Sequence, residues 1–213
     1  MNHRVFFSGA ISAIMVGVPA FADDLTISTG TATAVTTATA ANSTPGNITI
    51  GSSGSVTIAA AGAAVTLNSN NVVVNNGTIS NTVDTSAVGV QINAGNSGSF
   101  TNNGAIKIPG NGTPPTSTGL FGVLLNGTGV FTGDIVTTSG STITISGLSA
   151  NAIAIQSELN GKLTQGGTIT SSGSLSNGVI TSALIDGAFT NTGTITTDRG
   201  TGNTGTVNPG SPV

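Results

Sequence analysis

Four carboxylates in the second half of the chain are the residues best suited to catalysis: Asp134, Glu158, Asp186 and Asp198. Paired carboxylates hydrolyse glycosidic bonds, one as the acid and the other as the base or nucleophile, when they lie within roughly 5 to 10 Å of each other. In a repetitive chain, side chains far apart in sequence converge only if they occupy the same position in neighbouring repeats. The repeat around these carboxylates therefore decides whether they can act together.

Other reactive side chains are missing beyond residue 22. The chain has no Cys, and its single His is His3. Serine is abundant but has no histidine base, and the thiolate and imidazole ligands typical of zinc sites are absent. The nonapeptide repeat that binds calcium is not found either. We therefore expect no catalytic, cofactor-binding or metal-binding residues, and no enzymatic activity.

The elements that would position side chains are short strands at regular spacing. Three-residue apolar or β-branched runs begin at Ile48, Val56, Val65 and Val72, and each is followed by Gly, Ser or Asn. Alternation places the outer two side chains of each run on one face and the middle one on the other. Strands this short can pair with the equivalent strands of the next coil in a solenoid.

A longer period runs through the second half, in units that begin at Ala87, Leu120, Asn151 and Asn177. Each unit has a large apolar residue followed by a turn and an Ile. The predicted anchor column is Val73, Phe100, Phe131, Leu163 and Phe189, and the predicted Ile column is Ile79, Ile106, Ile135, Ile169 and Ile195. One unit per coil predicts an all-β fold, a right-handed parallel β-helix (β-solenoid) of about six or seven coils. Two short coils per unit is the alternative.

Glycine and asparagine are expected at the corners of the coils. We expect positive φ angles at Gly77, Gly104, Gly133, Gly167 and Gly193, because Gly adopts them without steric cost. Neighbouring asparagines suit corners and can form stacked amide ladders; they are Asn75, Asn76, Asn102, Asn103 and Asn191. The three prolines between positions 109 and 115 predict a loop that leaves one corner.

In this alignment the four carboxylates occupy different positions of the repeat, so we interpret them as solvated turn residues. The residues on either side of the Ile column include several Thr-x-Thr pairs, a pattern typical of ice-binding solenoids. Lys107 and Asp134 interrupt the predicted array. We therefore interpret these flanking residues as ordinary outward strand residues.

Residues 1–22 have the pattern of a secretory signal peptide. A short positive region with His3 and Arg4 precedes an apolar stretch from Val5 to Val18, and Ala20-Phe21-Ala22 is a small-x-small cleavage signal. The apolar stretch is shorter than the about 20 residues that a membrane span requires. Cleavage after Ala22 would leave three cations against seven carboxylates, a net charge of −4, which gives no basic surface for nucleic acid.

Composition and repeats divide the chain after residue 22 into three segments. Of 213 residues, 32 are Gly and 11 are charged, whereas an ordinary soluble domain has about 25% charged residues. We predict a low-complexity Thr/Ala segment at 23–46 that leads into the solenoid, β-solenoid repeats at 47–199, and a disordered Gly/Asn/Pro tail at 200–213.

Several motifs in succession carry a family resemblance, among them NITIGSSGSVTI, SGSFTNNGAIKI and LNGKLTQGGTITSSG. Following a signal peptide, and extending from Leu25 to about Arg199, they resemble the N-terminal passenger region of large bacterial autotransporters, the type V secreted proteins. The resemblance implies a β-helical passenger that a C-terminal β-barrel holds at the cell surface or releases. A barrel needs at least about eight strands of about 10 residues. No such strands are expected after Arg199, so we expect a passenger region without its barrel.

These observations lead to the hypothesis of an exported, non-catalytic, structural or adhesive surface module. Its expected partners are a host surface, extracellular matrix or polysaccharide, and an outer-membrane β-barrel if the chain belongs to a longer protein. No nucleic acid is expected. The expected location is the cell surface, the outer membrane or the extracellular space, or the periplasm if no barrel exports the chain. The alternatives are a β-solenoid that self-assembles through open ends and a polysaccharide-acting β-helix protein.

Overall fold

The computed structural model describes residues 24–110 and 118–198. Within these ranges the chain consists of strands and one short 3-10 helix, η1 (Thr37–Thr39). The expected signal peptide, most of the proline-containing loop and the expected tail lie outside the described residues.

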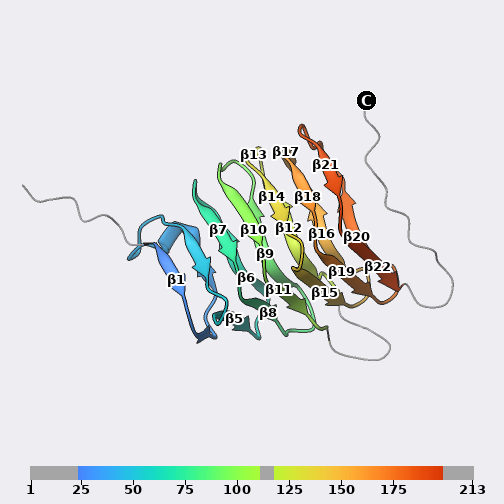
Figure 1. The fold of residues 1–213 in the computed structure, drawn as a ribbon, viewed down its shortest axis with the longest axis horizontal. Helices are drawn as coiled ribbons and strands as arrows, with labels where there is room; N and C mark the ends of the chain where they lie inside the picture. Colours follow the sequence, from blue (N-terminus) through green and yellow to red (C-terminus); the bar gives the residue numbers. More distant parts are fainter. Residues whose placement is uncertain (1–23, 111–117, 199–213) are drawn as a thin grey trace, which may run out of the picture.

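Three parallel sheets run the length of the molecule (Figure 1). Sheet A contains β1 (Leu25–Ile27), β4 (Ile48–Ile50), β7 (Val72–Asn75), β10 (Ser99–Asn102), β14 (Ile135–Thr137), β18 (Leu163–Gln165) and β21 (Phe189–Asn191). Sheet B contains β2 (Gly30–Thr31), β5 (Ser55–Ile58), β8 (Thr78–Asn81), β11 (Ala105–Ile108), β15 (Thr142–Ser146), β19 (Thr168–Ser172) and β22 (Thr194–Asp198). Sheet C contains β3 (Val35–Thr36), β6 (Gly62–Leu67), β9 (Ala87–Asn93), β12 (Phe121–Asn126), β16 (Asn151–Ile155) and β20 (Asn177–Thr181). A further pair is formed by β13 (Val130–Thr132) and β17 (Glu158–Asn160).

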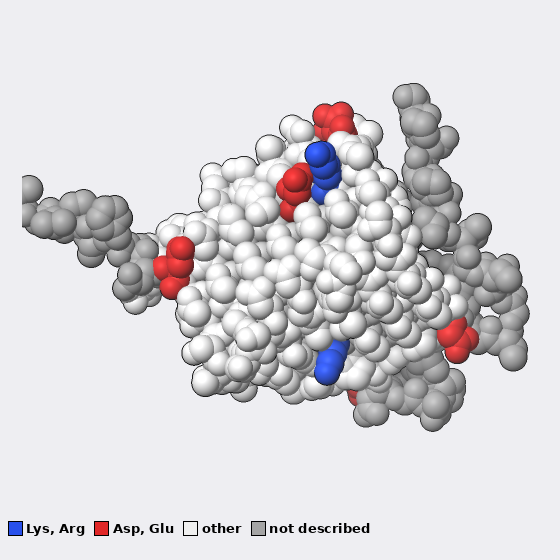
Figure 2. All heavy atoms as spheres, viewed as in Figure 1, with Lys and Arg blue, Asp and Glu red and all other residues white. Residues whose placement is uncertain are grey.

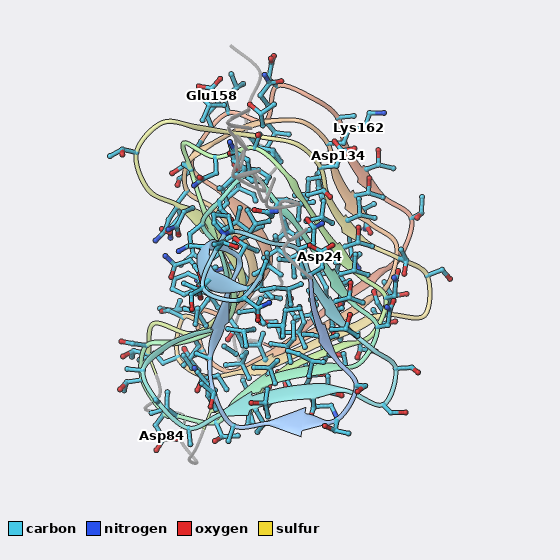
Figure 3. The ribbon with its side chains drawn as sticks, turned by 90° about the vertical axis from the view of Figure 1, so that its left-hand side faces the viewer. Asp24, Asp84, Asp134, Glu158 and Lys162 are labelled. Carbon is cyan, nitrogen blue, oxygen red and sulfur yellow. The ribbon has the colours of Figure 1, made fainter. Side chains whose placement is uncertain are left out.

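The chain visits sheets A, B and C in turn, and each circuit is one coil. The described residues contain six complete coils and the first two strands of a seventh, β21 and β22. Figure 3 looks along the stack of coils. The all-β parallel solenoid is thus confirmed, and each long sequence unit contributes one coil rather than two. The first coil begins at Leu25, inside the 23–46 segment that the sequence placed before the repeats.

The anchor column differs from its prediction in the fifth coil. Phe100 aligns with Ile135, and Ile135 with Leu163, so Ile135 takes the anchor position predicted for Phe131. Phe131 instead lies in β13, opposite Leu159.

The separation between aligned residues of the third and fourth coils grows from 27 in sheet B (Ile79 and Ile106) to 33 in sheet C (Val90 and Val123), so most of the extra chain lies in the proline-containing connection between β11 and β12 of the fourth coil. It shifts the anchor of the fifth coil four residues beyond the position that spacing predicts. The other predicted anchors are confirmed by the sheet A register.

The Ile column is displaced in the same coil. Ile106 aligns with Ile143, and Ile143 with Ile169, so Ile143 occupies the position predicted for Ile135. Eight residues separate Ile135 from Ile143, because an additional turn contains Gly140 with φ +86°. The remaining predicted members of this column are confirmed.

The core is a set of apolar columns that meet inside the coils. Phe100, Ile106 and Ile143 are buried in one continuous cluster that also includes Val123 of sheet C. Sheet C contributes very small residues where it faces the Ile column: a Cβ added to Gly122 would lie 2.8 Å from Cγ2 of Ile143. Gly89 and Gly178 face Ile106 and Ile195 in the same way, so a glycine of sheet C repeatedly makes room for an isoleucine of sheet B in the following coil.

The corner glycines are required for close contact between coils. Gly133 has a positive φ of 140°, but Gly77, Gly104, Gly167 and Gly193 do not fall in that range, so the prediction is wrong for these four. A Cβ at Gly104 would lie 2.1 Å from the carbonyl oxygen of Gly77 in the preceding coil. Stacking at about 4.8 Å brings the backbones of successive corners together and leaves no room for a side chain there.

Candidate functional site

Charged side chains are few on the described surface. In residues 24–110 and 118–198 the cations are Lys107 and Lys162, and the anions are Asp24, Asp84, Asp134, Glu158, Asp186 and Asp198; none is buried. Figure 2 shows wide uncharged areas between them. The same ranges contain no group of three side chains suited to hold a metal ion. The main chemistry of the described surface is that of neutral hydroxyl and amide groups.

Asp134 lies beside Lys162 rather than beside another predicted carboxylate. Its Oδ1 accepts a hydrogen bond of 2.8 Å from the backbone N–H of Lys162 in the next coil, and the two residues lie on one side of the stack in Figure 3, away from Glu158. Glu158 pairs with Val130 in the register of β13 and β17. Asp134 thus supports the turn that begins the next coil.

Asp186 belongs to a different column from Asp134. The backbone N–H of Asp186 donates a hydrogen bond to the carbonyl of Leu159. The residues that occupy the position of Asp134 in the next two coils are Lys162 and Ala188, whose carbonyls accept the equivalent hydrogen bonds. The two carboxylates therefore lie two coils apart, about 9.6 Å by coil spacing alone, and at different positions along the coil. Asp198, in β22, aligns with Ser172.

The most regular polar surface is the outer face of sheet B. Alternation directs the isoleucines of this sheet into the core and the residues on either side of them outward. The outward pairs, in coil order, are Ser55 and Thr57, Thr78 and Ser80, Ala105 and Lys107, Thr142 and Thr144, Thr168 and Thr170, Thr194 and Thr196. The last three pairs, all threonines and all exposed, are called the threonine array below.

A buried polar ladder fixes the corner between sheets A and B. Nδ2 of Asn75 donates to Oδ1 of Asn102 over 2.7 Å, and both side chains are fully buried. In the later coils the same column contains Thr137, whose hydroxyl contacts Oε1 of Gln165. The amide ladder predicted from the asparagines is confirmed at Asn75 and Asn102. Because buried amides must keep their hydrogen bonds, the ladder holds successive strands in one register.

Hydrogen bonds from the second coil lower the pKa of Asp24 at the start of the first. Nδ2 and the backbone N–H of Asn47 both donate to the carboxylate over 2.9 Å. These hydrogen bonds, that of the side chain first, lower the pKa of Asp24 below its ordinary 3.8. The contact ties the start of the first coil to the second.

The sequence interpretation placed four of the six threonines of the array beside the Ile column and missed the other two, because it aligned the fifth coil by spacing. That alignment put Asp134 and Val136 on either side of the Ile column, where the structure has Thr142 and Thr144. A local signal was available: the tripeptide Thr-Ile-Thr recurs at 142–144, 168–170 and 194–196. Alignment on this tripeptide would have placed all six threonines correctly.

Comparisons of the chain with protein-family models, curated proteins and solved structures found no match. No helix in the described ranges is long and apolar enough to cross a membrane.

Proposed function

We propose that the chain is a non-catalytic adhesive or structural module of the autotransporter passenger type, exported across the inner membrane and exposed outside the cell. It acts by presenting the outer faces of a rigid solenoid to a host surface, extracellular matrix or polysaccharide. The observation that carries this proposal is the separation between inside and outside. Apolar columns and neutral amides fill the interior, whereas polar side chains form repeated rows on the outside.

This separation favours an adhesive surface over a catalytic site. Enzymes tune the pKa of catalytic groups through burial and neighbouring charges, and the charged side chains of the described residues are exposed or half-buried. Repeated outward rows provide many equivalent weak contacts, which together give a polymer or a cell surface a high avidity. A solenoid face suits this use because the coils hold the rows at constant spacing.

The first test is export and adhesion of the full chain. When the chain is produced in bacterial cells, N-terminal sequencing of the exported protein should begin at Asp23. The purified protein should bind at least one immobilised polysaccharide or matrix protein without releasing reducing sugars. Release of sugar by the purified chain would contradict the proposal, and so would retention in the cytoplasm with residues 1–22 intact.

A matched pair of variants separates adhesion by the fold from nonspecific adhesion. Ile143→Asp places a charge in the core and should abolish both the β-type circular dichroism spectrum and binding, because a buried unpaired charge is very costly. Thr144→Asp, one residue away, points outward and should keep the fold. If unfolded Ile143→Asp protein bound as well as the wild type, the folded solenoid would not be the adhesive element.

Self-assembly is a second candidate function, favoured by the last described strands. Phe189 and Ile195, which pack against the core, are half-buried. Their equivalents one coil earlier, Leu163 and Ile169, are fully buried. The edges of β20, β21 and β22 and this partly exposed core could pair with the first coil of a second copy, which is an open, head-to-tail contact.

Light scattering over a concentration series of the full chain tests this candidate. We expect assemblies whose length rises with concentration, and we expect Phe189→Lys to prevent them while the preceding six coils stay folded. A wild-type protein that remains a monomer at high concentration would eliminate self-assembly.

A further inference from the structure

The threonine array is a two-dimensional grid of equivalent side chains. It has three rows, one in each of β15, β19 and β22, and two columns. Between the columns, Ile143, Ile169 and Ile195 point inward and anchor the rows to the core. Adjacent rows are about 4.8 Å apart and the two columns about 6.7 Å apart, from the dimensions of parallel strands.

The six threonine side chains of the array are exposed. None of the six threonine hydroxyls has a hydrogen-bond partner among the described residues. Threonines elsewhere do hydrogen-bond within the fold: the hydroxyl of Thr138 donates to Asn103 over 2.8 Å, and that of Thr181 donates to the carbonyl of Ala183 over 2.6 Å. Each hydroxyl of the array is therefore free to donate one hydrogen bond and to accept others from outside.

The grid is also rigid. Each row is hydrogen-bonded to the next through a continuous parallel ladder, and the β-branched threonine side chain has few accessible rotamers. At the corners before the second and third rows, a Cβ at Gly167 or Gly193 would lie within 2.5 Å of atoms of the preceding coil, which shows how closely the coils are packed. The hydroxyl and methyl groups thus keep a fixed repeat.

The grid carries no charge, which limits the ligands that suit it. Lys107 lies on the preceding row and Asp198 beside the last one, outside the six positions. A small soluble ligand needs a concave site with convergent polar groups, whereas these side chains point outward in parallel. A flexible polymer would lose conformational entropy at each residue that it aligned with the grid. A neutral crystal is already ordered in two dimensions and has no such cost.

We propose that the threonine array binds the surface of ice. The free hydroxyls take the place of water molecules at the crystal surface, since each can both donate and accept, and the methyl groups between them exclude mobile water. Crystalline polysaccharide is the competing neutral lattice. Flat sugar rings pack well on aromatic side chains, but the chain has no Trp or Tyr, and none of the described phenylalanines lies in sheet B. The grid therefore fits a water lattice better than a sugar lattice.

Inhibition of ice recrystallisation by the purified full chain tests this proposal. The wild type should keep ice grains small on annealing and should enter a growing ice front with a fluorescent label. Thr170→Lys, in the middle row, should raise the concentration needed by about tenfold or more, because a hydrated ammonium replaces a group that contacts the crystal. Thr164→Lys is the matched control: it changes the same residue type in the same coil, on the outer face of sheet A.

Three results would overturn the proposal. The first is a wild type with a β-type circular dichroism spectrum but no effect on ice. The second is an equal loss of ice recrystallisation inhibition in Thr170→Lys and Thr164→Lys, which would show that the activity does not depend on the threonine array. The third is binding to crystalline cellulose or chitin that Thr170→Lys abolishes, without any effect on ice. Because adhesion to other surfaces is measured separately, the failure of ice binding would leave the proposed adhesive function standing.

Discussion

The outer faces of sheets B and C are built on the same coils but have opposite chemistry. Sheet B presents exposed threonines in its last three coils. Sheet C carries an apolar cluster outside the main core, in which Val88 and Leu124 are 6% and 5% exposed and Ala154 is fully buried, with Ala63 and Phe121 packed against them. The comparison shows that parallel pairing determines which residues of a strand face outward but does not determine whether those side chains are polar or apolar.

The two faces are connected through the interior. In sheet C the register places Gly122 and Val123 next to each other, and both face inward: Val123 belongs to the core cluster, and a Cβ at Gly122 would meet Ile143. The pairing keeps one residue opposite one residue on both sides of Gly122, so this break in the alternation, which sheet B lacks, is repeated from strand to strand without an inserted residue.

The largest expected effect comes from the isoleucine beneath the threonine array. Ile143→Ala should lower the free energy of unfolding by about 3 kcal/mol, since it leaves a cavity in a fully packed column. Its outward neighbour provides the control: Thr144→Ala should change stability by about 0.5 kcal/mol or less. Urea unfolding followed by circular dichroism measures both. Equal losses in the two variants would contradict the inward position of Ile143.

A somewhat smaller effect is expected where sheet C makes room for sheet B. Gly122→Ala should cost about 2 kcal/mol by overpacking, because its Cβ would lie 2.5 Å from the carbonyl oxygen of Ala152. Gly140→Ala is the comparison variant: nothing lies within 4 Å of its Cβ, and φ is +86°, so only backbone strain of about 1 kcal/mol remains. A larger loss in Gly140→Ala, measured by the same urea titration, would show that backbone strain outweighs space at these positions.

Short-range patterns predicted the fold well because they arise from local alternation. The three-residue runs at Ile48 and Val56 are strands, and most members of both columns lie where their spacing placed them. The fifth coil was misaligned because inserted chain changes the spacing without changing the local pattern, so Phe131 and Ile135 both qualified as anchors. The role of Gly104 depends on a contact with the preceding coil, which no local rule contains. For the same reason Thr142 and Thr144 were left out of the Thr-x-Thr pairs predicted beside the Ile column.

A third prediction compares the same substitution, to serine, on the outer faces of sheets C and B. Leu124→Ser on the outer face of sheet C should destabilise the protein by about 1.5 kcal/mol, since it removes most of a buried apolar side chain. Thr144→Ser on sheet B should be nearly neutral. If thermal unfolding gave a negligible loss for Leu124→Ser, the apolar cluster of sheet C would contribute little to the fold.

The smallest effect belongs to neither face and concerns the contact between the first two coils. The pKa of Asp24 is lower in the folded state, through its hydrogen bonds with Asn47, so the folded protein holds this proton less tightly than the unfolded chain. The contact therefore contributes to stability above the unfolded pKa, and the contribution is lost as the pH falls through the lower folded value. We expect the melting temperature of the wild type to decline more steeply below about pH 4 than that of Asp24→Asn. Asn47→Ala removes the donors and should flatten the profile in the same way. Parallel profiles in all three proteins would mean that this carboxylate does not couple the first coil to the second.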